Sequence, residues 1–83
     1  MSYVPSPEHR PDRTLDTLGT YCPIPVLRTA RMLAQMNTGQ ILELLSDDRG
    51  VLADIPDWCR GHGHEYLGCR EEARLYRLYI RKV

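Results

Sequence analysis

The sequence predicts a small two-layer α+β domain, with four strands and two helices in the order βαβαββ. Three observations support this class: amphipathic segments separate apolar runs, the last segment alternates apolar and polar side chains, and 83 residues allow one small domain. Two helices cannot cover both faces of a four-stranded sheet. We therefore expect both helices on one face and an open opposite face.

The first elements follow a proline-rich beginning. Residues 1–12 carry three prolines and few apolar side chains, so we expect a flexible tail there and a folded domain over residues 13–83. Residues 14–18 form a short extended segment that ends at Gly19. A helix is expected after Cys22, because apolar side chains recur on one stripe. The stripe consists of Val26, Leu27, Ala30, Leu33 and Ala34. Arg28 and Arg31 fall on the other side of this helix, and residues 37–39 end it.

The second half of the chain predicts a strand, a helix and two further strands. Residues 41–45 are almost continuously apolar, which is typical of an interior strand. After a turn at residues 47–50, Asp54 is the expected N-cap of the second helix, with Pro56 in its first turn. Its inward side is expected to carry Ile55, Trp58, Cys59 and His62, and Gly61 and Gly63 end it. Residues 64–69 and 74–81 predict two strands, and the alternation of the last places Leu75, Arg77 and Tyr79 on the open face.

Charge and composition exclude several classes of function. Eleven basic and eleven acidic side chains cancel, which argues against DNA or an acidic membrane as a direct partner. No apolar stretch is long enough to span a membrane, and the first twelve residues do not resemble a secretory signal. We therefore expect a cytoplasmic protein whose three cysteines are reduced thiols.

Cys22 is the candidate catalytic residue, because it lies in the motif Cys22-Pro23-Ile24-Pro25 where an extended segment meets a helix. A residue before proline is disfavoured in the α region, so Cys22 is expected at the N-cap position, with Pro23 or Pro25 as the first helical residue. A helix N-terminus stabilises a thiolate, which predicts a pKa below that of an ordinary thiol. Together with Gly19, the residues of the motif form the supporting turn. A cysteine without such a setting is more often a small buried hydrophobe.

Several clusters in a fixed order resemble the TusA/SirA-like sulfur-carrier family. They are Leu15-Asp16, Gly19, Cys22-Pro23-x-Pro25, Gly39, Asp47-Asp48, Asp54-Ile55-Pro56-x-x-Cys59, Gly63-His64-Glu65 and Ile80-Arg81-Lys82. The resemblance implies a mixed four-stranded sheet and a persulfide carried on Cys22. It also implies a cysteine desulfurase or rhodanese-like sulfur donor and a downstream acceptor protein. Ile24 and Thr20 depart from the tRNA-thiolation members, which leaves the sulfur-oxidation, molybdenum-cofactor and selenium-related branches open.

Other candidate residues have simpler interpretations. Cys59 is expected in the core, whereas Cys69 could face the core or the open sheet. A zinc set of Cys59, His62, His64 and Cys69 fits no standard spacing, so we expect neither a metal nor a cofactor.

Docking of a partner protein defines a second set of candidate residues. Asp47 and Asp48 are either turn formers or partner-docking residues. The further docking candidates are Arg28, Arg31, Arg77 and Tyr79. The alternative function is a regulatory module that docks partners through its open face, with Cys22 incidental. The two functions differ in whether Cys22 takes up sulfur.

Overall fold

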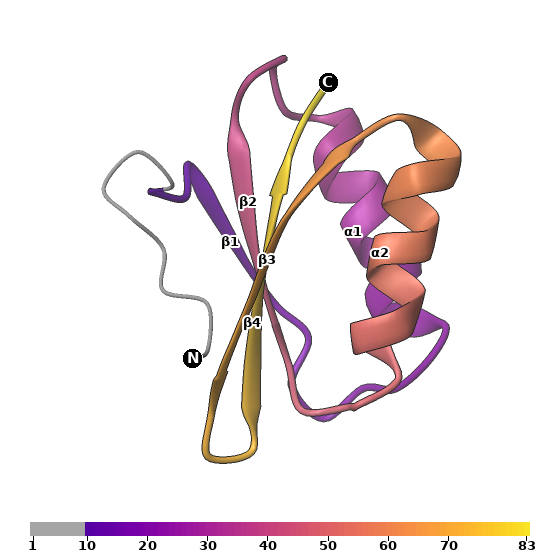
Figure 1. Cartoon of the computed structure of the whole chain (residues 1–83), viewed down its shortest axis with the longest axis vertical. Coiled ribbons are helices and arrows are strands. Elements are labelled where there is room, and N and C mark those ends of the chain that lie inside the picture. The colour runs from indigo at the N-terminus through magenta and orange to yellow at the C-terminus, as the bar shows by residue number, and fades with distance from the viewer. Residues whose placement is uncertain (1–9) are drawn as a thin grey trace.

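The computed structural model describes residues 10–83 and confirms the predicted order βαβαββ (Figure 1). The elements are β1 (Arg13–Asp16), α1 (Ile24–Ala34), β2 (Ile41–Ser46), α2 (Val51–His62), β3 (Glu65–Glu72) and β4 (Leu75–Arg81). Both helices lie on one face of the sheet, as expected (Figure 1). Of the expected N-terminal tail, residues 1–9 lie outside the described residues.

The four strands form one mixed sheet in the order β1-β2-β4-β3. The β1 and β2 strands are parallel, and α1 makes the crossover between them, whereas β4 is antiparallel to both of its neighbours. Asp12 extends the β1 edge, because its backbone N–H donates to the Ile41 carbonyl at 2.7 Å and its carboxylate accepts the Ile41 N–H at 2.8 Å. Since β1 and β2 run in the same direction, the loops that follow them leave the same edge of the sheet.

The core lies between the sheet and the two helices. The central strands supply Leu42, Leu44, Leu78 and Ile80, all 0% exposed. Full burial of an aliphatic side chain of this size contributes about 1.5–3 kcal/mol. Cys59 from α2 is 1% exposed, which confirms its predicted place in the core.

The buried face of α1 is rotated relative to the predicted stripe. Pro25, Thr29 and Leu33 are buried, whereas Leu27 is 58% exposed and Ala34 is exposed. Leu33 is buried and Val26 packs against the core as expected, but the prediction was wrong for Leu27 and Ala34 because it ranked positions by apolarity. Proline in the first turn loses no helical hydrogen bond, and threonine is small enough to pack against the sheet. The true stripe therefore has a proline and a threonine where the sequence suggested polar or turn positions.

The second helix begins at Val51, four residues before the expected start, with Gly50 rather than Asp54 at the N-cap position. The earlier start follows from a turn in which the Asp48 carboxylate accepts the Gly50 N–H at 3.2 Å. Asp54 then falls in the first turn of α2, where a carboxylate is stabilised by the helix dipole. Gly63 ends the helix with φ of 77°, as predicted, whereas Gly61, also expected to end it, lies within the last turn of the helix.

The expected inward side of α2 is only partly correct. Ile55 and Cys59 are buried, but Trp58 is half-buried and His62 is exposed. The Trp58 ring stacks on the rings of His62 and His64, at centroid distances of 4.5 and 5.3 Å. The two histidine rings thus stack on the tryptophan ring at the end of the helix.

Candidate functional site

Cys22 lies on the loop between β1 and α1, and of the three cysteines it is the exposed one. Helix α1 begins at Ile24 with Pro23 at the N-cap position, so Cys22 lies one residue further out than expected. Neither Pro23 nor Pro25 is the first helical residue, so that expectation was also wrong. The Cys22–Pro23 peptide bond is cis. Pro25 is less than 2% exposed, so this residue of the motif is also a core residue.

The loop that carries Cys22 is tied to the loop that follows β2. The Asp48 carboxylate accepts the backbone N–H of Cys22 at 3.0 Å through one oxygen and that of Gly50 at 3.2 Å through the other. The Asp47 carboxylate accepts the Gly19 N–H at 3.2 and 3.3 Å. The two aspartates, expected as turn formers or docking residues, therefore bind both ends of the cysteine loop.

Thr17 anchors the start of the same loop, and sequence reasoning missed it. Its side chain is 0% exposed, and both its hydroxyl and its backbone N–H donate to the Leu45 carbonyl. The Thr17 carbonyl in turn accepts the Thr20 hydroxyl at 2.7 Å and the Thr20 N–H at 3.1 Å. Gly19 lies within this turn with φ of 81°, a value that favours glycine. The loop is thus held in place before it reaches Cys22.

The electrostatics of Cys22 differ from the sequence prediction. A hydrogen bond to the Asp54 carboxylate raises the pKa of the Cys22 thiol, and desolvation and the charges of Asp54 and Asp48 raise it further. The expected lowering of this pKa was therefore wrong. Its physical reason is that Cys22 lies outside the first turn of α1, where the dipole acts, and beside the first turn of α2, which carries an acid.

Four large apolar side chains near Cys22 in sequence are exposed to solvent. They are Leu18 at 44%, Tyr21 at 71%, Ile24 at 42% and Leu27 at 58%, and we call them the apolar collar. Leu27 had been expected in the core. All four lie within five positions of Cys22 in the sequence, and exposed apolar side chains that form a contiguous patch are typical of a protein-binding surface.

Arg77 and Tyr79 lie on the sheet face opposite the helices, as predicted, but they form an internal cluster. The Glu43 carboxylate, 9% exposed, accepts the Tyr79 hydroxyl at 2.8 Å and Arg77 Nη1 at 3.3 Å. Arg77 also binds Glu72 at 2.8 Å. Tyr79 is only 2% exposed, so it offers little surface for docking.

The other two cysteines face the protein interior. Burial raises the pKa of the Cys59 thiol to about 11. Cys69 is half-buried and packs against the core cluster, and burial raises its pKa as well. Of the two alternatives for Cys69, the core and the open sheet face, the structure therefore shows the core side, which the helices cover.

Within residues 10–83, no group of three or more histidine, cysteine or acidic side chains is placed to hold a metal ion. No helix in that part of the chain is long and apolar enough to cross a membrane.

Fold and site together define a small α+β domain that presents one exposed cysteine on a tethered loop. A family model described as Sulfurtransferase TusA matches residues 13–82, and the chain therefore belongs to the TusA family. This confirms the resemblance found in the sequence.

Two relatives and one solved structure extend the comparison. The "putative sulfur carrier protein YrkF" of Bacillus subtilis (strain 168) is 37% identical over 68 residues, a match covering 82% of this chain and 37% of YrkF. The "putative sulfur carrier protein" of Archaeoglobus fulgidus is 33% identical over 69 residues. This match covers 83% of this chain and 94% of that protein. The crystal structure of a SirA-like protein from Desulfitobacterium hafniense matches with a TM-score of 0.69 at 29% identity. The match covers 83% of this chain and 95% of the chain in that structure. The chain thus spans little more than a third of YrkF but nearly all of the other two proteins.

Proposed function

We propose that this protein is a sulfur carrier that holds sulfane sulfur as a persulfide on Cys22. The observation that carries the proposal is the exposure of Cys22 on a loop fixed by Asp48, while Cys59 and Cys69 face the interior. The donor is a cysteine desulfurase or a rhodanese-like protein, and the acceptor is a second protein. Family membership and the descriptions of the relatives support this assignment.

Sulfur uptake on Cys22 is an exchange between a thiol and a persulfide. The Cys22 thiolate attacks the terminal sulfur of the donor persulfide, so that a new S–S bond forms as the donor's S–S bond breaks. The donor cysteine leaves as a thiolate and takes up the proton that Cys22 released. Transfer to the acceptor repeats the exchange with Cys22 as the leaving group. No external oxidant or reductant is needed.

The environment of Cys22 suits a carrier that acts only when docked. The Asp54 and Asp48 carboxylates raise the pKa of the thiol, which lowers its thiolate fraction and slows its reaction with other electrophiles. The apolar collar provides a surface that a donor or acceptor covers during transfer. We assign the carrier function to residues 13–83, and we place the protein in the cytoplasm because its three free thiols require a reducing compartment.

The test is to incubate the protein with a cysteine desulfurase and cysteine, or with a rhodanese and thiosulfate, and to measure the intact mass. We expect the mass of one added sulfur atom, which dithiothreitol removes. The adduct is expected to be absent in Cys22→Ser and present in the matched controls Cys59→Ala and Cys69→Ser. Sulfur that remains in Cys22→Ser, or no uptake from several active donors, would favour the partner-docking module instead.

A further inference from the structure

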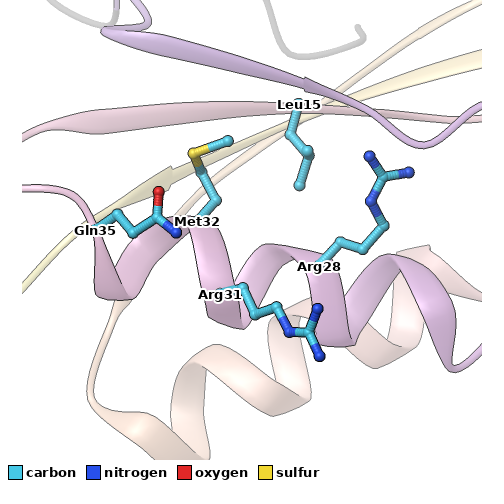
Figure 2. A pocket seen from close by; sticks show the side chains of 5 residues that line it. All are labelled: Leu15, Arg28, Arg31, Met32 and Gln35. Atoms are coloured by element: carbon cyan, nitrogen blue, oxygen red, sulfur yellow. The ribbon is translucent and has the colours of Figure 1, made fainter.

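A pocket lies between helix α1 and strand β1, from the middle of the helix to its C-terminal end. Its volume is about 200 Å³, and its lining residues are Leu15, Arg28, Arg31, Met32 and Gln35. Figure 2 shows Arg28, Met32 and Gln35 extending from α1 toward β1, where Leu15 extends to meet them, while Arg31 leaves the helix away from β1. Leu15 is only 8% exposed, so the pocket has an apolar floor and a polar rim.

Of the ten arginines in residues 10–83, six form no ion pair with a carboxylate, and Arg28 and Arg31 of this pocket are among them. Four arginines form ion pairs with carboxylates: Arg60, Arg70, Arg77 and Arg81. No carboxylate within residues 10–83 pairs with Arg28 or Arg31. Arg13 adds a third cation, because its Nη1 lies 4.0 Å from the Met32 sulfur. The pocket thus carries two guanidinium groups without an ion pair, and a third lies close to it, on a chain whose net charge is zero.

The two carboxylates closest to Leu15 in sequence each accept a backbone N–H and form no ion pair with these arginines. The Asp12 carboxylate accepts the Ile41 N–H at 2.8 Å, and the Asp16 carboxylate accepts the Leu18 N–H at 2.9 Å. A free guanidinium binds a carboxylate through two parallel hydrogen bonds, which makes an acidic group the complementary ligand.

We propose that this pocket receives an aspartate or glutamate side chain of the protein that exchanges sulfur with Cys22. The methylene groups of such a side chain would pack on Leu15 and Met32, and its carboxylate would bind Arg28, with the Gln35 amide as a second donor. Arg31, at the outer side, adds attraction over a longer range.

The occupant is a protein side chain because the pocket continues the apolar collar along the same helix. Arg28 directly follows Leu27 of the collar and lies four residues after Ile24, which is about 6 Å along the helix axis. A partner that covers the collar thus brings its neighbouring surface onto the pocket. This inference rests on the proposed function, since it names the docking chemistry of the same sulfur transfer.

The experiment compares wild-type protein with Arg28→Gln/Arg31→Gln, which lowers the net charge by two as Arg74→Glu also does, in sulfur loading by a desulfurase or rhodanese that loads the wild type. Arg74→Glu is the matched control, because Arg74 is also exposed and without an ion pair in the described chain, and lies in the turn between β3 and β4. We expect the double variant to raise KM for the carrier by about tenfold with kcat unchanged. The dependence of this KM on salt concentration should become weaker. Thermal melting confirms that both variants fold, and iodoacetamide reacts with Cys22 at the wild-type rate in both.

The outcomes separate the two proposals. An unchanged KM in the double variant would overturn the docking role while sulfur loading still supports the carrier function. An equal rise in KM for Arg74→Glu would show that net charge alone explains the effect, and it would also overturn the docking role. If glutarate or inorganic phosphate, at matched ionic strength, inhibits loading without competing with the donor protein, the site binds free anions instead. If no donor loads the wild type, both proposals fall.

Discussion

Replacing Asp48 with alanine tests whether its carboxylate holds the cysteine loop. The substitution removes the acceptor for two backbone donors, the N–H groups of Cys22 at 3.0 Å and Gly50 at 3.2 Å. A hydrogen bond to a charged group contributes about 1.5–3 kcal/mol when water is excluded. Asp48 is half-exposed, so water compensates part of this, and we expect a total loss near 2 kcal/mol. For a domain of this size, that lowers Tm by roughly 8–16 °C.

The same substitution is expected to change two measures of reactivity in opposite directions. Loss of the Asp48 charge removes one cause of the raised pKa of Cys22, so alkylation by iodoacetamide at pH 7 should become faster. Sulfur loading by a donor protein should become slower, because the loop no longer holds the sulfur in a fixed position. The control is Asp47→Ala, which frees only the Gly19 N–H and should leave alkylation of Cys22 unchanged.

Thermal denaturation followed by circular dichroism, timed alkylation and intact-mass loading measure these three effects. The reasoning is refuted if Asp48→Ala melts at the wild-type temperature and loads sulfur at the wild-type rate.

Two further predictions concern thiol protonation. Asp54→Asn removes the main cause of the raised pKa of Cys22. The inflection in a plot of alkylation rate against pH should therefore move to lower pH. An inflection at the wild-type pH would exclude Asp54 as that cause. Burial raises the pKa of Cys59 to about 11, so above roughly pH 8.5 the unfolded chain releases a proton that the folded chain keeps, and stability falls as pH rises. The urea midpoint should therefore drop more between pH 8 and pH 10 in the wild type than in Cys59→Ala, and equal drops would contradict the assignment.

The fold was predictable because its signals are strong and local. The alternation in β4 and the apolar run in β2 each determine which side chains face the helices, and Leu44 and Leu78 are fully buried as a result. The rotation of α1 was not predictable in this way. It depends on Pro25 and Thr29, residues that apolarity scales place outside the core, and on how the helix packs against the sheet.

The site was predictable in its central residue but not in its electrostatics. The motif around Cys22 indicated an exposed cysteine before a helix, and the structure places it there, one residue further out. The raised pKa depends on Asp54, which is 32 positions away in sequence and whose place in the first turn of α2 was mispredicted as an N-cap. Contacts between loops that follow different strands leave no local pattern in a sequence. They become visible only when the topology brings those loops to one edge of the sheet.

The bonds that fix the cysteine loop are made to main-chain N–H groups, at Gly19 and Cys22. Nearly every residue type supplies such a group, so these bonds do not depend on the exposed side chains of the loop and of the first turns of α1. The outward positions Ile24 and Leu27 are therefore free to vary at a cost of only about 0.5 kcal/mol each. A scaffold of this kind can change its exposed apolar surface by substitution alone, while the loop that carries Cys22 keeps its position.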